Sequence, residues 1–178
     1  SSNDIYAYNI TEKGEKGIEF TVDVSGEPER FTLPLPGIHN VYNALSAISV
    51  AEIFGIGPEE IREGLLEFKP SKDRMEIITL KDGIKVINDV YNANPDSMAA
   101  AIRVLKSMKS GGRTICVLGD MFELGDMSQR EHVRLGEYAA NAGVDIVIAV
   151  GDFSGYVTKG VLNKRTNNSR AYDFSSNK

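Results

Sequence analysis

A period-two alternation of apolar and polar residues marks the first part of the chain. It is cleanest in GIEFTVDV, where Ile18, Phe20, Val22 and Val24 alternate with polar or charged residues. Such alternation is typical of a strand with one buried face. The segments EKGEKG and SGEPER interrupt the pattern as turns, so we expect a small antiparallel meander between residues 5 and 35.

The hydrophobic period then changes to that of a helix in GIHNVYNALSAISVAEIFGIG. Gly55 or Gly57 is expected to end this helix. A second helix is predicted in PEEIREGLLEF, because Pro58 suits a first helical turn and the two following glutamates suit a helix N-terminus. The apolar face of the first helix is expected to hold Val41, Ala44, Leu45, Ile48 and Ala51.

The polar, proline-containing segment KPSKDR predicts a domain boundary near residue 70, between domains 1–70 and 71–178. After it, MEIITL and IKVINDV flank the turn KDG and predict a hairpin. Two buried strands (RTICVLGD, DIVIAVG) and a last short strand (SRAYDF) then alternate with helices (PDSMAAAIRVLKSM, SQREHVRLGEYAANAG, SGYVTKGVLN). The pattern indicates an α/β fold with a Rossmann-like, mostly parallel sheet covered by helices on both faces. In the first of these helices the inward residues are expected to be Met98, Ala101, Ile102, Leu105 and Met108.

Composition narrows the class of protein. The 178 residues are 42% hydrophobic and 25% charged, with a net charge of -5, which argues against a nucleic-acid partner and leaves a small anionic ligand possible. The single cysteine, Cys116, cannot form an internal disulfide and is expected in the core of a reduced protein. No apolar run approaches the roughly 18 residues of a membrane span. We expect a cytoplasmic monomer without a membrane span.

The segment KVINDVYNANPDSMAAAI places several polar residues at the end of an apolar strand. Asn94 can cap the following helix while Pro95 takes its first position. Asp89 and Asn92 are not needed for that cap, and a carboxylate beside exposed amides suits the hydroxyls of a ribose or another sugar. The alternative is an Asx turn that only stabilises the loop.

Two further sets of polar residues are candidates for ligand binding. In parallel sheets ligands bind beyond the carboxyl ends of the strands, where Asp89, Asp120 and the pair Gly151–Asp152 are expected. Asn40 and Asn43 lie three positions apart on one helical face and could together meet a purine edge. The alternative is that Asn40 caps the helix and Asn43 is solvated.

Other kinds of site find no support in the sequence. His39 and His132 are the two histidines, and with one cysteine they give no metal-ligand spacing and no nucleophilic triad. The phosphate-loop pattern G-x-x-x-x-G-K-[ST] does not occur. By its residues alone, the chain shows no catalytic machinery.

Four segments nevertheless resemble the Mur ligases of peptidoglycan synthesis: PGIHNVYNALSA, DRMEI, INDVYNANPDSMAAAI and CVLGDMFELGDMSQREHVRLGEYA. The resemblance covers roughly residues 30–151. The motifs YNANP and LGDMFELG resemble those of the family members that add D-alanyl-D-alanine to UDP-N-acetylmuramoyl-tripeptide. The resemblance therefore implies ATP-dependent amide formation through an acyl phosphate, with these two compounds as substrates and Mg²⁺ as the metal.

The resemblance also implies roles for individual residues. Asn40 and Asn43 would face the adenine of ATP, Asp89 would hold its ribose, and Arg74 would reach toward the phosphates and ribose as a catalytic residue. Tyr91, Asn92 and Asn94, together with Asp120 of the GDMFELG turn, would flank the dipeptide. The family commonly reads DDSYNANP, whereas this chain has Asn88 and Val90 beside Asp89, and the resemblance carries no role for these two.

The family's phosphate loop, magnesium-binding glutamate and carbamylated lysine would lie upstream of residue 1, and its last helix and strand beyond Lys178. Residues 1–70 would then be the end of the central ATPase domain and residues 71–178 most of the C-terminal domain. Such a fragment is expected to be inactive alone, with Mg²⁺ held mainly by the upstream part. The alternatives are a non-catalytic nucleotide-binding module and a related ligase with a different amino-acid acceptor.

Overall fold

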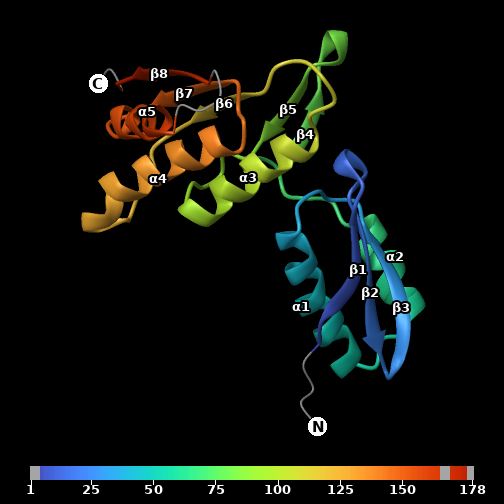
Figure 1. The fold of residues 1–178 in the computed structure, drawn as a ribbon. Helices are drawn as coiled ribbons and strands as arrows, with labels where there is room; N and C mark the ends of the chain where they lie inside the picture. The colour runs from blue at the N-terminus through green and yellow to red at the C-terminus, as the bar shows by residue number, and fades with distance from the viewer. Residues whose placement is uncertain (1–4, 165–168, 176–178) are drawn as a thin grey trace. The chain divides into compact units, whose positions relative to one another are not determined.

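The computed structural model describes residues 5–164 and 169–175. The chain divides into two compact units, Ser1–Lys72 and Asp73–Lys178 (Figure 1). The division falls within KPSKDR, close to the boundary that the sequence predicts.

The first unit is a three-stranded antiparallel sheet with two helices. The strands β1 (Ala7–Glu12), β2 (Ile18–Val24) and β3 (Glu27–Leu33) pair in chain order, as the predicted meander requires. The helices α1 (His39–Ile53) and α2 (Pro58–Glu67) follow, and Pro58 occupies the first turn of α2 as expected.

The core of the first unit forms where the predicted apolar faces meet. The alternating residues of β2 are at most 3% exposed, which confirms the expected strand face. From α1 the predicted residues are buried except Ala51, which is partly buried. The core comprises Ile18, Phe20, Val22, Val24, Phe31, Leu33, Leu35, Val41, Ala44, Leu45, Ile48, Ile61 and Leu65.

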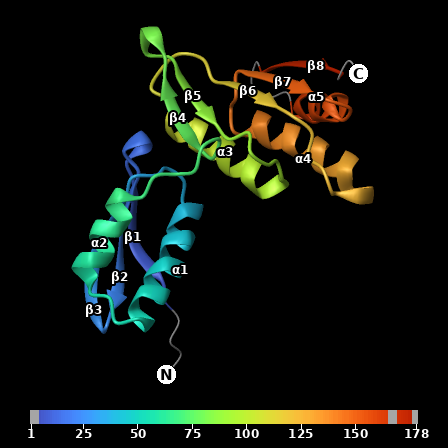
Figure 2. The same cartoon turned by 180° about the vertical axis from the view of Figure 1, so that it is seen from behind.

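The second unit begins with a hairpin and a helix. Strands β4 (Glu76–Thr79) and β5 (Lys85–Asn88) pair antiparallel around the KDG turn, which confirms the predicted hairpin. The helix α3 (Pro95–Ser107) follows the polar loop after β5. In both views of the ribbon, α3 runs beside this hairpin (Figures 1 and 2).

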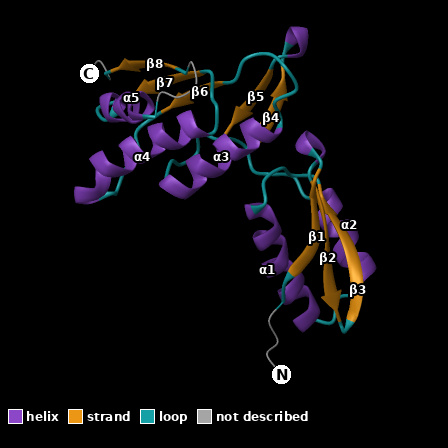
Figure 3. Ribbon diagram, viewed as in Figure 1, coloured by secondary structure: helices purple, strands orange, loops and turns teal. Residues whose placement is uncertain are grey.

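The remainder of the second unit alternates strand and helix (Figure 3). Strands β6 (Ile115–Leu118), β7 (Ile146–Val150) and β8 (Arg170–Phe174) form a parallel sheet in chain order. Helices α4 (Ser128–Asn141) and α5 (Ser154–Asn163) connect them. This confirms the predicted α/β class and its parallel sheet.

The two faces of the parallel sheet differ in burial. Cys116 and Leu118 of β6 are 7% and 8% exposed and belong to a core built with residues of α3, α4 and α5. Ile115 and Val117, on the opposite face, are 47% and 68% exposed. Within residues 5–164 and 169–175 the helices therefore cover one face of this sheet, whereas the sequence predicts cover on both.

The burial of Cys116 was expected, and it raises the pKa of the thiol to about 12.

Helix α3 buries two opposite sides rather than one stripe. Ile102 is 1% exposed and, with the partly buried Met98 and Leu105, packs in the core of the parallel sheet. Ala100 and Val104 lie on the other side of the helix at 100° per residue and are 4% and 1% exposed. The sequence prediction placed a single inward stripe and missed this second side.

Among the described helices, none combines the length and apolar character needed to cross a membrane.

Candidate functional site

The segment Asp73–Arg74–Met75, at the start of the second unit, has an unusual backbone. Asp73 and Met75 have φ angles of 63° and 47°, in the left-handed region that residues other than glycine rarely adopt. Each such residue costs on the order of 1–3 kcal/mol and persists only where its surroundings enforce it. The exposed Arg74 lies between them. This segment is therefore held in shape by other parts of the unit.

Three hydrogen bonds from the end of the hairpin hold that segment. The Asn88 side-chain amide donates to Asp73 Oδ1 at 2.9 Å, and the Tyr91 backbone N–H donates to the Asp73 carbonyl oxygen at 3.1 Å. The Met75 backbone N–H donates to Asp89 Oδ1 at 3.0 Å. Asn88, for which the family resemblance gave no role, thus fixes the residue before Arg74.

The Arg74 side chain stacks on an aromatic ring. Its guanidinium carbon lies 4.1 Å from the centroid of the Tyr91 ring, within the range of a cation–π contact. Among the described residues Arg74 makes no ion pair with a carboxylate. Its N–H donors therefore remain available to an anionic ligand.

The Asp89 carboxylate has one oxygen engaged and one available. Oδ1 accepts from Met75, and within the described part of the chain Oδ2 makes no hydrogen bond. The partner of Oδ1 is 14 residues away in sequence, so the alternative of a local Asx turn is wrong. The free oxygen can accept a hydrogen bond from a hydroxyl group of a ligand.

The remaining residues of the loop after β5 divide between exposure and capping. Tyr91 is 68% exposed, and Asn92 is exposed as well. Asn94 forms a capping box with Ser97: Asn94 Oδ1 accepts from the Ser97 backbone N–H at 2.9 Å, and the Ser97 hydroxyl accepts from the Asn94 N–H at 3.1 Å. The predicted cap with Pro95 in the first turn is confirmed, and it engages the side-chain oxygen of Asn94.

Asp120, at the end of β6, binds the start of α5. Its Oδ2 accepts from the Asp152 backbone N–H at 2.7 Å, and its Oδ1 accepts from the Phe153 N–H at 3.0 Å. Gly151 has a φ of 126°, and a side chain there would overlap the Asp120 carboxylate. Asp120 and Gly151–Asp152 thus meet as predicted, whereas Asp89 follows a hairpin that is not hydrogen-bonded to the parallel sheet.

A buried histidine fixes the loop that follows Asp120. His132 is 0% exposed, and its Nε2 accepts from the Met121 backbone N–H at 3.0 Å. Its Nδ1 must therefore carry the proton, which it donates to the Ser128 carbonyl oxygen at 2.6 Å. The ring stacks on Phe153 with the centroids 4.8 Å apart. His132 ties the loop to α4 and α5, a role that the sequence did not reveal.

The two asparagines of the first unit contact each other. Helix α1 has no side-chain cap, so the alternative that Asn40 caps it is wrong. Asn40 is 8% exposed; its Nδ2 donates to the Pro36 carbonyl oxygen at 2.8 Å, and its Oδ1 accepts from Asn43 Nδ2 at 3.3 Å. Asn43 is exposed. Asn40 therefore orients Asn43, which offers its side-chain oxygen and its second N–H to a ligand.

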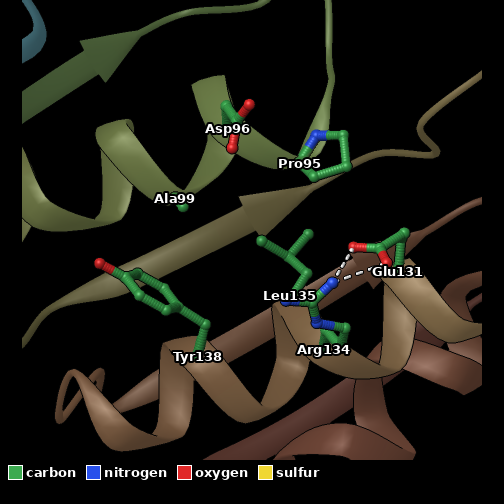
Figure 4. Close-up of a pocket in the computed structure, with 7 residues that line it drawn as sticks. All are labelled: Pro95, Asp96, Ala99, Glu131, Arg134, Leu135 and Tyr138. Atoms are coloured by element: carbon green, nitrogen blue, oxygen red, sulfur yellow. Dashed lines mark hydrogen bonds and ion pairs between the residues drawn. The ribbon is translucent and has the colours of Figure 1, made fainter.

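A pocket of about 230 Å³ lies between α3 and α4 (Figure 4). Arg134 bonds Glu131 at 2.8 Å within it, so the two charges compensate each other. Apart from the helix start at Pro95, the pocket shares no residue with the loop after β5. It is lined by Pro95, Asp96, Ala99, Glu131, Arg134, Leu135 and Tyr138.

The described residues do not form a magnesium site. Across residues 5–164 and 169–175, no three histidine, cysteine, aspartate or glutamate side chains gather in a way that could hold a metal ion. Carboxylate oxygens are the usual protein ligands of Mg²⁺, and the Asp89 carboxylate belongs to no such group of three among these residues. We therefore assign no metal contact to these residues.

Known proteins resemble the chain in both sequence and fold. Residues 73–173 match the family model described as "Mur ligase, glutamate ligase domain". The "UDP-N-acetylmuramoyl-tripeptide--D-alanyl-D-alanine ligase" of Bacillus subtilis is 37% identical over 157 residues, which are 88% of this chain and 34% of that protein. The ligase of the same name from Escherichia coli is 39% identical over 151 residues, or 85% of this chain and 33% of that protein.

A crystal structure of MurF from Acinetobacter baumannii superposes with a TM-score of 0.81 at 30% sequence identity, and the match covers 97% of this chain and 42% of that one. The chain thus spans about a third of the length of the curated relatives it matches. The family model covers more than half of the chain, and the resemblance seen in the sequence motifs is confirmed. The chain belongs to the Mur ligase family.

Proposed function

We propose that this chain is part of a longer ATP-dependent ligase that joins D-alanyl-D-alanine to UDP-N-acetylmuramoyl-tripeptide in the synthesis of peptidoglycan precursors. The names of the relatives from Bacillus subtilis and Escherichia coli support the two substrates. A MurF structure from Thermotoga maritima, which shares the fold at 18% identity and a TM-score of 0.72, is a complex with ADP. We place the reaction in the cytoplasm, where ATP and UDP-linked sugars occur.

The proposed reaction has two steps. The terminal carboxylate of the tripeptide attacks the γ-phosphorus of ATP, so that an acyl phosphate forms and ADP leaves. The amine of the dipeptide then attacks the acyl carbon, the C–O bond to phosphate breaks, and the nitrogen loses a proton. Both steps depend on positioning and on cations placed against the charge of the phosphoryl oxygens.

The proposal that this part of the chain binds ATP rests on the surroundings of Arg74. Its guanidinium is exposed, lies over the Tyr91 ring and has no ion pair among the described residues. The Asp89 carboxylate, which has one free oxygen, accepts a hydrogen bond from the backbone of Met75, the next residue. We assign Arg74 to the phosphates and Asp89 Oδ2 to a ribose hydroxyl. A cation with free donors, and a free carboxylate oxygen on the side chain that binds the next residue along the chain, suit a ligand that carries both phosphate and sugar.

The other predicted residues receive narrower roles. Asn43 is proposed to read the adenine edge, with Asn40 orienting it from its buried position. Asn92 remains proposed for the dipeptide because it is exposed. Both Asp120 oxygens bind backbone amides, so we assign Asp120 to shaping the loop rather than to direct substrate contact.

The test is phosphate release by the full-length ligase. We expect release to require ATP, UDP-N-acetylmuramoyl-tripeptide and D-alanyl-D-alanine together, and to fall strongly in Arg74→Ala. Arg130→Ala, which removes an exposed arginine from α4, is the matched control and should retain wild-type release. A full-length protein that binds ATP but releases no phosphate in the presence of both other substrates would instead be a non-catalytic nucleotide-binding module. Release with a single amino acid in place of the dipeptide would identify a different acceptor.

A further inference from the structure

The contact between Tyr91 and Arg74 is held through both backbone and side chains. The Tyr91 N–H donates to the Asp73 carbonyl oxygen at 3.1 Å, one residue before Arg74. The Tyr91 ring then lies under the guanidinium at 4.1 Å from its centroid to the guanidinium carbon. The ring is therefore anchored to the same segment that carries the arginine.

The backbone on both sides of Arg74 is also fixed. Asp73 and Met75 are left-handed, and Asn88 and Asp89 hold them by side-chain hydrogen bonds of 2.9 and 3.0 Å. The position of the Arg74 Cα atom is thereby set. What freedom remains lies in the rotatable bonds of the arginine side chain, and stacking on an aromatic ring reduces it.

The guanidinium carbon of Arg74 lies over the face of the Tyr91 ring. The five N–H donors of arginine point outward in the plane of the group, so a ring against the face blocks none of them. Arg74 is exposed and forms no ion pair among the described residues. A guanidinium held over the ring, with donors that meet no carboxylate of the described residues, can donate two parallel hydrogen bonds to a phosphate group.

We propose that Tyr91 is a positioning residue for Arg74: its ring holds the guanidinium in the orientation that meets a phosphate oxygen of ATP. This differs from the contact with the dipeptide that the sequence suggested for Tyr91, and it rests on the proposed function. Because the ring face makes the contact, the phenolic hydroxyl has no part in this role. Phenylalanine should therefore replace tyrosine, and leucine should not.

The kinetic experiment uses the full-length ligase with phosphate release as the readout. In Tyr91→Leu we expect kcat/KM for ATP to fall about tenfold while the KM for D-alanyl-D-alanine stays within twofold. Tyr91→Phe and Tyr91→Trp, which keep an aromatic face, should stay within about twofold of wild type. A Tyr91→Leu enzyme equal to wild type, or one whose KM for the dipeptide rises instead, would overturn the positioning role.

A double-mutant cycle tests whether Tyr91 acts through Arg74. In the Arg74→Ala background, Tyr91→Leu should cause no further loss in kcat/KM, because the group that it positions is already gone. Losses that multiply would show that Tyr91 acts independently and would contradict the proposal. If Tyr91→Leu fails to fold, Tyr91→Phe and Tyr91→Trp still decide, since losses of tenfold in both would rule out a role for the ring face.

A measurement on the chain itself separates this proposal from the proposed function. The nuclear magnetic resonance signal of the Arg74 Nε–H should show a ring-current shift that persists in Tyr91→Phe and disappears in Tyr91→Leu. A wild-type ligase that releases no phosphate would contradict the proposed function while this shift persists. A shift that does not respond to Tyr91→Leu would contradict the positioning contact, whatever the activity.

Discussion

Gly136 of α4 and the backbone of Val157 of α5 meet with no side chain between them, because a Cβ atom on Gly136 would overlap the Val157 carbonyl oxygen. The contact is reciprocal: a Cβ on Gly160 of α5 would overlap the Val133 carbonyl oxygen of α4. Two glycines thus let the helices that flank the Asp120 loop approach closely. This close approach places Phe153, at the start of α5, against the His132 ring of α4.

Gly136→Ala should therefore destabilise the second unit by about 1–3 kcal/mol, because close-packed backbone cannot accept an added methyl group without shifting. The measurement is hydrogen exchange of the α4 and α5 amides in increasing urea. Gly155→Ala is the control, since a Cβ there has nothing within 4 Å, and it should be neutral or slightly stabilising. Equal behaviour of the two variants would contradict the close crossing.

Asp145 should make the stability of the second unit dependent on acid pH. Hydrogen bonds from the Thr114 backbone N–H, the Thr114 hydroxyl and Lys109 lower the pKa of Asp145 to about 2. Its folded pKa is below the ordinary value of 3.8, so its contribution is present above about pH 4 and is lost as the pH falls toward 2.

The Asp145 side chain is 38% exposed, so solvent screening limits the contribution to about 1 kcal/mol. Urea unfolding of wild type and Asp145→Asn at several pH values measures it. The two should differ at pH 6 and converge near pH 2. A difference independent of pH would show that the carboxylate charge has no part in the effect.

Asp89 variants separate the structural oxygen from the free one. In the full-length ligase, Asp89→Ala should raise the KM for ATP at least tenfold, since a charged acceptor of a hydrogen bond contributes about 1.5–3 kcal/mol. Asp89→Asn keeps an oxygen for the Met75 N–H and loses only the charge, so its KM should rise less.

The matched control for these variants is Asp82→Asn. Asp82 lies in the turn between β4 and β5 with a φ of 63°, a conformation that asparagine also tolerates. The KM of the Asp82→Asn enzyme for ATP should equal that of wild type. An unchanged KM in Asp89→Ala would leave Asp89 as a structural residue only and would remove the ribose assignment.

The two asparagines of α1 should have different roles: Asn43 in nucleotide recognition and Asn40 in the stability of the first unit. Asn43→Ala should lower the preference for ATP over GTP about fivefold, the equivalent of one hydrogen bond of about 1 kcal/mol, without destabilising the first unit. Asn40→Ala should destabilise that unit by about 1–3 kcal/mol, because the buried Pro36 carbonyl loses its donor. Ser46→Ala, on the exposed side of α1, is the control. Full selectivity in Asn43→Ala would exclude the adenine contact.

The order of elements could be predicted because each carries its own local signal. The alternation of Ile18, Phe20 and Val22 marks β2, and the cap at Asn94 with Pro95 marks the start of α3. These signals act within a few residues, so they can be read along the chain. The resemblance to the Mur ligases likewise rests on short motifs that can be read along the chain.

The site could be predicted only in part, because its contacts join residues distant in sequence. Asp120 binds amides 32 and 33 residues away, and no local pattern distinguishes that role from substrate contact. Met75 has a left-handed backbone although it is not a glycine, so nothing in its identity signals its conformation. The exposure of Val117 depends on which other elements cover that face of the sheet, and the periodicity of the sequence does not predict this.

The central claim is that the site formed by Arg74, Asp89 and Tyr91 binds ATP. Titration of the isotopically labelled chain with Mg-ATP tests this claim most directly. We expect the resonances of these residues and of Met75 to move together with a Kd of roughly 1 mM, equivalent to about 4 kcal/mol, because a few contacts must offset the cost of immobilising the ligand. Asp89→Ala should weaken the response. Micromolar binding, or shifts confined to the α3–α4 pocket around Arg134, would contradict the account.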